Sequence, residues 1–248
     1  MAGPAPGTGA FYEEAYAPSA DAGRHGRWRA LSAEAKADHV IELAHAIGLR
    51  APATVAEVGC GDGSVLALLG QRGFGARRVG FEIAGAAVEI AASRPELASV
   101  EAFDGDHVPA PDDAFDLVFA THVLEHVPAP AQLLAELMRV GRAVVIEVPL
   151  EANLSARRPA ARAASAAAGH IHHFDRGQVR RLVADAHWTV RAERVDPLPR
   201  AVHLFDRETP RARATGLAKW AVRRAAATAP AVGTRLFTMH YALIATPV

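Results

Sequence analysis

The stretch TVAEVGCGDGSVLALL (residues 54–69) decides the fold prediction, because an apolar run passes through three glycines into a second apolar run. TVAEVGC has the pattern of a buried strand, and SVLALL has that of a short helix. The same order recurs further along the chain. We predict strands in ARRVGFEI, SVEAFDG, AFDLVFATHV and RAVVIEVPL, and helices in GAAVEIAAS and after Pro130. This alternation predicts an α/β fold with a doubly wound, mainly parallel sheet.

The last third of the chain combines two strand-like segments with helical ones. WTVRAERV and RLFTMHYALIA have the β-branched and aromatic composition of strands, and the basic, Ala-rich stretch between them (197–232) is helical with breaks at two prolines. Asp175 is suited to cap a helix that continues to Ala186. Two late strands at one edge of a sheet are a natural place for a helical insertion between them.

The N-terminal segment predicts a tail followed by one helix. The first ten residues are Gly, Pro, Ala and Thr apart from the Met, which is typical of a loose tail. Ser32 is suited to cap a helix from Ala33 to about Ile47. Gly48 is suited to the left-handed conformation that ends such a helix.

Composition narrows the class of protein. The 248 residues are enough for one large domain, and 27 basic side chains balance 27 acidic ones. This zero net charge argues against a dedicated nucleic-acid binder. A single cysteine excludes a disulfide framework and a Cys-rich zinc site. We expect a cytoplasmic protein without a membrane segment, because no apolar run approaches 18–20 residues and the opening lacks a signal-peptide pattern.

The three glycines of EVGCGDGS predict a ligand-binding turn between strand and helix. Glycine lets the backbone turn tightly and approach a ligand with no Cβ in the way. The helix that follows presents free N–H groups to a polar or anionic group. The simpler alternative is a purely structural turn. Ser64 stands where the dinucleotide fingerprint G-x-G-x-x-G requires its last glycine, which argues against a nicotinamide enzyme.

Carboxylates follow the next two predicted strands. Glu82 ends the second strand, about twenty residues past the glycine turn, where an acidic side chain binds ribose hydroxyls. Asp104 ends the third strand, where a carboxylate is able to hold an exocyclic amine of a base. The alternatives are a solvated carboxylate for Glu82 and an ordinary Asp-Gly turn for Asp104.

Together, EVGCGDG, then FE, then DGDHVPAPDDAFDLVFATHVLEHVP resemble the class I S-adenosylmethionine-dependent methyltransferases, and most of all the group that methylates small molecules. The resemblance spans roughly residues 57–149. It implies a seven-stranded, doubly wound sheet whose last strand is antiparallel. It also implies N-terminal tail and lid helices (1–50) and a cofactor-binding domain (51–248), with acceptor-side insertions near 151–174 and 198–233.

The resemblance assigns S-adenosyl-L-methionine contacts residue by residue. Glu57, Gly59 and Gly61 correspond to the methionine end, and Glu82 with Ile83 to the ribose and adenine. Thr121 corresponds to the region near the sulfonium. Asp104 and Gly105 correspond to the adenine edge. Because the chain departs from the family pattern at Gly105-Asp106, the choice of carboxylate between Asp104 and Asp106 stays open.

Histidines are the candidate bases for an oxygen or protonated-nitrogen acceptor, because imidazole titrates near neutral pH. His122 and His126 lie in THVLEHV, while His170 and His173 lie in GHIHHFD. His126 has a simpler alternative role, a bond to backbone at the start of the next helix. The GHIHHFD segment is otherwise a structural loop. We expect no metal there, because the H-x-H-H spacing has no matching carboxylate pair.

Several other side chains are considered as functional residues. The aromatic group Phe11, Tyr12, Tyr16 and Trp28 either forms a lid over the acceptor or packs the N-terminal helix. Cys60 lies within the glycine turn, so we interpret it as a packing residue. The basic residues of the 197–232 stretch either steer an anionic substrate or form a solvated helix face.

The function predicted from the sequence is methyl transfer to an oxygen or nitrogen of a small molecule. The high Ala and Arg content suits a GC-rich genome and natural-product biosynthesis. The alternatives are methylation of a protein or RNA and a non-catalytic S-adenosylmethionine-binding module. The expected partner is a small-molecule acceptor, with neither membrane nor nucleic acid, and the expected state is a monomer or homodimer.

Overall fold

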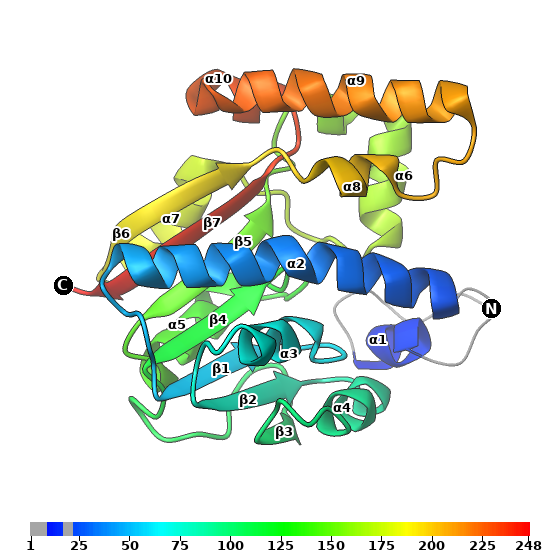
Figure 1. The fold of residues 1–248 in the computed structure, drawn as a ribbon. Coiled ribbons are helices and arrows are strands. Elements are labelled where there is room, and N and C mark those ends of the chain that lie inside the picture. The colour runs from blue at the N-terminus through cyan, green and yellow to red at the C-terminus, as the bar shows by residue number, and fades with distance from the viewer. Residues whose placement is uncertain (1–8, 17–21) are drawn as a thin grey trace.

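A single sheet organises the chain in the computed structural model, which describes residues 9–16 and 22–248. Within these residues seven strands pair in the order β3-β2-β1-β4-β5-β7-β6, and β7 runs antiparallel to both neighbours (Figure 1). The strands are β1 (Thr54–Val58), β2 (Arg77–Glu82), β3 (Ser99–Ala102), β4 (Leu117–Thr121), β5 (Val144–Pro149), β6 (Trp188–Asp196) and β7 (His240–Pro247). The predicted doubly wound, mainly parallel seven-stranded fold is confirmed.

Helices cover both faces of this sheet. They are α1 (Gly9–Tyr16), α2 (Ala22–Ala46), α3 (Ser64–Gln71), α4 (Gly85–Ala92), α5 (Pro130–Val140), α6 (Pro159–Ala167), α7 (Arg176–Asp185), α8 (Arg200–Leu204), α9 (Pro210–Ala227) and α10 (Pro230–Leu236), with a 3-10 turn at Ser155–Arg157. Buried side chains of α2, α3 and α4 pack on one face, and those of α5 and α7 pack on the other.

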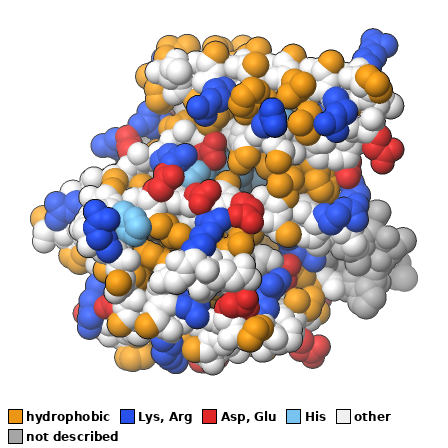
Figure 2. Space-filling view, viewed as in Figure 1, with side chains coloured by type: hydrophobic (Ala, Val, Ile, Leu, Met, Phe, Trp, Pro, Cys, Tyr) orange, Lys and Arg blue, Asp and Glu red, His pale blue; other side chains and the backbone are white. Residues whose placement is uncertain are grey.

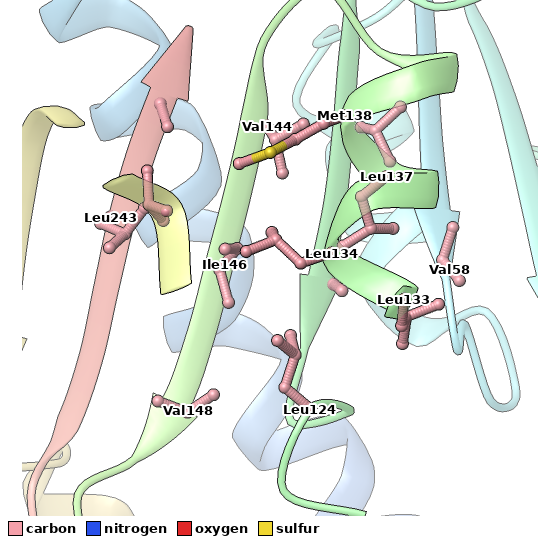
Figure 3. Close-up of a cluster of buried hydrophobic side chains, with 14 of the residues drawn as sticks. Val58, Leu124, Leu133, Leu134, Leu137, Met138, Val144, Ile146, Val148 and Leu243 are labelled. Carbon is pink, nitrogen blue, oxygen red and sulfur yellow. The ribbon is translucent and has the colours of Figure 1, made fainter. Parts of the chain in front are cut away.

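The core follows from the two-residue period of the strands. In β4, Leu117 and Phe119 face the α2 side, while Val118 and Ala120 face the α5 side. Strands buried on both faces read as continuous apolar runs, which is why AFDLVFATHV is so apolar. Helix α5 presents a stripe of large side chains toward β4 and β5 (Figure 3): Leu133, Leu134, Leu137 and Met138.

Two element boundaries were predicted wrongly. Helix α2 begins at residue 22 and passes through Ser32, whose hydroxyl donates to the carbonyl of Arg29 one turn back instead of capping an N-terminus. The final strand begins at His240 rather than at Arg235, because Pro230 starts α10 and that helix continues to Leu236. The predicted tail lies outside the described residues for positions 1–8, and positions 9 and 10 belong to α1.

Helices α8, α9 and α10 occupy the connection between β6 and β7 and lie beyond that edge of the sheet (Figure 1). Figure 2 shows Lys and Arg side chains interspersed with apolar ones over this region. Arg211, Arg213, Lys219 and Arg224 are exposed there. None of the described helices is both long and apolar enough to span a membrane. The division of the chain at residue 50 stays a prediction.

Candidate active site

Two adjoining cavities lie where β1, β2 and β4 end. The larger has a volume of about 360 Å³, and its lining includes Glu82, Ile83, Asp104, Gly105, Asp106 and His126. The smaller has about 170 Å³, and its lining includes Glu57, Thr121, Arg29, Lys36, Asp62 and Ser64. Tyr16, Gly59, Gly61 and His122 line both cavities. All nine residues expected to contact the cofactor therefore line one cavity or both.

The glycine turn needs glycine at two positions for different reasons. Gly59 has φ +74°, and a Cβ there would lie 2.5 Å from Cγ2 of Val123. Gly61 has φ +53°, and a Cβ there would collide with the hydroxyl of Tyr16. Side chains at either position would strain the backbone and fill the space where the two cavities meet.

Glu82 holds the turn in place from the end of β2. Its side chain is 6% exposed, and Oε2 accepts the N–H of Gly61 at 2.7 Å. Oε1 accepts the N–H groups of Ile83 and Ala84 at 2.8 and 3.0 Å. A carboxylate has about four acceptor positions, so one remains for a ligand hydroxyl in the larger cavity.

Glu57 has an unsatisfied oxygen in the smaller cavity. The residue is 2% exposed, Oε1 accepts the hydroxyl of Thr121 at 3.3 Å, and Oε2 has no hydrogen-bond partner among the described residues. Burial raises the pKa of the Glu57 carboxyl well above its ordinary range. A ligand ammonium group would supply the missing bonds, because a buried charge is stable only when paired.

Cationic side chains on α2 complete the smaller cavity, and sequence reasoning missed them. Arg29 and Lys36 both line it, and Arg29 Nε donates to Asp62 Oδ2 at 2.9 Å. The two residues are seven apart, which places them on one face of a helix two turns apart. The seven-residue spacing of Arg29 and Lys36 could have indicated this shared helix face. It was missed because the expected cap at Ser32 placed Arg29 outside the helix.

Asp104 forms a turn at the end of β3. Its Oδ1 accepts the N–H groups of Asp106 at 2.9 Å and His107 at 2.7 Å. These bonds, that of His107 first, lower the pKa of the Asp104 carboxyl. Gly105 has φ +93°, and Asp104 and Asp106 are both exposed. The geometry favours neither carboxylate as the partner of a base, so that choice stays a prediction.

Helix α1 brings aromatic side chains over the site. Tyr16 lies against Gly61, and the Tyr12 ring packs edge-on against His126 with centroids 5.7 Å apart. Both carboxylate oxygens of Glu13 accept N–H groups at the start of α4, which anchors α1 there. Phe11 lies next to Gly169. These contacts favour the lid interpretation for α1.

Trp28 and Cys60 are packing residues. Trp28 packs against Phe205 with ring centroids 5.1 Å apart, and it lines neither cavity. The Cys60 side chain belongs to the core between the sheet and α2, and a Cβ on Gly80 would lie 2.6 Å from its Sγ. Burial raises the pKa of the Cys60 thiol, so this sulfur is a poor nucleophile.

His122 has the most unusual surroundings of the four histidine candidates. Its φ is +61°, a conformation that non-glycine residues rarely adopt. Nδ1 lies 3.0 Å from Glu125 Oε1, and Nε2 lies 3.1 Å from His240 Nδ1 and 3.4 Å from Glu147 Oε1. Burial and the charge of Lys36 lower the pKa of His122, but the bonds to these carboxylates raise it overall.

Glu147 connects His122 to a buried histidine on α2. It is fully buried, Oε1 lies 2.9 Å from His240 Nδ1, and Oε2 lies 2.8 Å from His39 Nδ1. The other ring nitrogen of His39 pairs with Asp196 at 2.9 Å. Burial alone would lower the pKa of His39, but Asp196 and Glu147 raise it to about 9. Burial and the charge of His122 lower the pKa of His240 to about 4.

The remaining candidates divide by position. His126 lines the larger cavity, and its Nδ1 lies 3.1 Å from the carbonyl of Gly169. His170 and His173 line neither of the two cavities. His170 Nδ1 pairs with Glu151 at 2.9 Å, and His173 is 52% exposed and bonds Ser165. His122 and His126 are therefore the histidines that reach the site.

The sheet order, the glycine turn and the paired cavities define a protein with the class I S-adenosylmethionine-dependent methyltransferase fold. A family model described as a methyltransferase domain matches residues 26–193. The chain therefore belongs to this methyltransferase-domain family, whose cofactor is S-adenosyl-L-methionine. The resemblance inferred from the sequence motifs is confirmed.

Known proteins give more specific likenesses. Over 101 residues the chain is 38% identical to a trans-aconitate 2-methyltransferase of Azoarcus sp. (strain BH72), a match that spans 39% of each protein's length. The geranyl diphosphate C-methyltransferase of Streptomyces coelicolor A3(2) has a TM-score of 0.64 at 15% identity, covering 87% of this chain and 79% of that one.

Two further solved structures share the fold. A sarcosine dimethylglycine methyltransferase from Galdieria sulphuraria, described as putative, has a TM-score of 0.60 at 15% identity and covers 86% of this chain and 85% of that one. A 4+2 cyclase has a TM-score of 0.59 at 17% identity and covers 86% and 82%. The fold alone therefore does not fix the reaction.

Proposed function

We propose that this protein transfers the methyl group of S-adenosyl-L-methionine to an oxygen or nitrogen atom of a small molecule. The relatives that it resembles act on small acceptors such as trans-aconitate and geranyl diphosphate. Natural-product biosynthesis is the proposed setting, supported by the Ala- and Arg-rich composition. The neutral net charge argues against the alternative of an RNA substrate.

One observation carries the proposal: the two cavities meet at the glycine turn and offer different chemistry. The smaller holds the unpaired oxygen of Glu57 beside Arg29 and Lys36. These groups suit the ammonium and carboxylate of an amino acid. The larger holds Glu82 for ribose hydroxyls and apolar Ile83 for a base. A ligand with an amino-acid end and a nucleoside end suits this pair of cavities.

When bound, S-adenosylmethionine supplies a methyl group that its sulfonium already activates. The chain's part is to align the acceptor and to remove its proton. We assign the proton acceptor to His122, because it lines both cavities and lies at the end of β4 beside Thr121. Glu147 orients the His122 ring through His240 and the 3.4 Å contact to Nε2.

Tyr12 and Tyr16 close the larger cavity from the α1 side. Excluding water there protects the reaction and strengthens the electrostatic contacts of His122 and Glu82. Phe11 of the same helix also lies against Gly169 of the GHIHHFD loop.

The experiment is single-turnover methyl transfer from radiolabelled S-adenosylmethionine to a panel of hydroxy acids, phenols, amines and prenyl diphosphates. We expect methylation of one class, and His122→Asn should lower the transfer rate by about 10²-fold while the cofactor affinity stays within about twofold. Cofactor binding with no transfer to any class would favour the non-catalytic module instead. Equal rates for the wild type and His122→Asn would remove His122 as the proton acceptor.

A further inference from the structure

A cluster of side chains beside the larger cavity lies outside the set of residues that we assign to the cofactor. It joins Glu125 and His126, which follow β4, with His170 of the GHIHHFD loop. Backbone bonds hold the two segments together: the carbonyl of Glu125 accepts the N–H groups of Ile171 at 2.9 Å and His172 at 3.0 Å. One ligand atom from each of Glu125, His126 and His170 lies within 4.8 Å of the other two.

Glu125 is a fully buried carboxylate whose Oε1 pairs with His122, while Oε2 has no hydrogen-bond partner among the described residues. His126 Nε2 lies 3.9 Å and His122 Nδ1 lies 3.0 Å from Oε1. A buried carboxylate oxygen that accepts no hydrogen bond, as Oε2 does here, is costly unless a cation compensates it. This points to a positively charged ligand between Glu125 and the imidazoles.

The two imidazoles are oriented as metal ligands are. A carbonyl oxygen only accepts, so His126 Nδ1 carries the proton that it donates to Gly169, and the lone pair is on Nε2. His170 Nδ1 likewise donates to Glu151, which leaves its Nε2 as the ligand atom. Glu151 is itself held by the hydroxyl of Ser165 at 2.6 Å. An outer acceptor on the second ring nitrogen is the usual support of a metal-bound histidine.

We propose that Glu125, His126 and His170 bind a divalent transition-metal ion of the zinc class. Two histidines and one glutamate are a ligand set of catalytic zinc, which leaves a position open for water or substrate. Zinc–ligand bonds of about 2.1 Å require the three ligand atoms, which lie within 4.8 Å of one another, to move closer together. His126 lines the larger cavity, so we place the open position on that side of the cluster. The H-x-H-H spacing alone lacks a carboxylate; the fold supplies Glu125 from another segment.

The test is metal binding by the full chain, which does not depend on methyl transfer. After dialysis against a chelator, Co²⁺ and Zn²⁺ are added and followed by visible absorption and calorimetry. We expect about one ion per chain and a ligand-field spectrum of low coordination number. Glu125→Gln, His126→Asn and His170→Asn should each weaken binding at least tenfold, and Glu151→Gln should weaken it by about 10–100-fold.

His187→Asn is the control, because His187 is an exposed histidine that lies outside the cluster. Its metal affinity should equal that of the wild type. Thermal unfolding checks that each variant is folded. If one ligand variant does not fold, the metal affinities of the other two still test the site. No stoichiometric binding at millimolar Co²⁺, or affinity unchanged in the ligand variants, would overturn the site. Cofactor binding measured on the same metal-free protein separates this outcome from failure of the proposed function.

Discussion

Glu57 is the residue whose surroundings point most directly to a ligand. Its Oε1 is bonded to Thr121, while Oε2 is buried, without a hydrogen-bond partner in the described part of the chain, in the cavity that Arg29 and Lys36 also line. An unpaired buried carboxylate is unfavourable, and burial accordingly raises the pKa of the Glu57 carboxyl. A ligand ammonium group bonded to Oε2 would stabilise the charged form.

Glu57→Gln should weaken S-adenosylmethionine binding by about 1.5–3 kcal/mol, or roughly 10–150-fold, because a charge-assisted hydrogen bond to the ligand ammonium is lost. Isothermal titration calorimetry measures this directly. Glu89→Gln is the control, since Glu89 is an exposed carboxylate on α4. Equal affinity for Glu57→Gln and Glu89→Gln would contradict the assignment of Glu57.

Glu82→Ala should also weaken cofactor binding, by about 1–3 kcal/mol, and should in addition loosen the glycine turn. The reason is that three backbone N–H groups, including that of Gly61, lose their acceptor. Hydrogen exchange at Gly61 and Ile83 should speed up even without ligand. Unchanged exchange at both amides would show that Glu82 does not hold the turn.

Among the elements, α7 shows how a sequence signal becomes structure. Asp175 accepts the N–H of Gln178 at 2.8 Å, and the Gln178 side chain accepts the N–H of Asp175 at 2.7 Å. The sequence analysis predicted the cap by Asp175 but not the return bond from Gln178. Helix α2 shows the opposite case, because its serine lies in mid-helix and only burial of Val40, Leu43 and Ala44 reveals how the helix packs.

Asp175→Ala should lower the free energy of unfolding by about 1 kcal/mol, which corresponds to a loss of about 2–4 °C in melting temperature. The cause is the loss of the cap on α7. Asp185→Ala, at the other end of the same helix, should cause no loss, because an acidic side chain near a helix C-terminus does not stabilise it. Denaturant unfolding of both variants checks the difference.

For the whole molecule, the nine residues expected to contact the cofactor were placed correctly at the two cavities, whereas the contacts of the histidine candidates were not predictable. The parallel strands bring Glu57, Glu82 and Thr121 to one sheet edge, so their order in the chain was enough to place them. Contacts between side chains that are far apart in the sequence leave no local sequence pattern. Only the structure shows that His170 pairs with Glu151 outside both cavities and that Arg29 bonds to Asp62.

The buried pairs around Glu147 predict how stability depends on pH. His39 has a folded-state pKa of about 9, above about 6.5 for an unfolded chain. Its contribution, up to about 3 kcal/mol, is complete below pH 6.5 and disappears as the pH rises through 9. His39→Gln should remove this alkaline loss. The check is denaturant unfolding from pH 6 to 10, and parallel curves for both proteins would contradict the prediction.

At acid pH the stability changes with pH in the opposite direction. Burial would raise the pKa of Glu147, but its bonds to His122, His240 and His39 hold it well below the ordinary range. The stability that Glu147 contributes is therefore present above about pH 4.3 and is lost as the pH falls through its lower folded-state pKa. Glu147→Gln should flatten the unfolding free energy between pH 2 and 5. A wild-type slope retained in this variant would contradict the assignment.

Calorimetric titration of the purified full chain with S-adenosylmethionine, S-adenosylhomocysteine and NAD tests the central claim most directly. A pair of cavities built for an amino acid and a nucleoside predicts saturable binding of the first two at one site per chain, and no heat from NAD at millimolar concentration. The claim would be contradicted by the absence of any response to S-adenosylmethionine at millimolar concentration, or by binding of NAD alone.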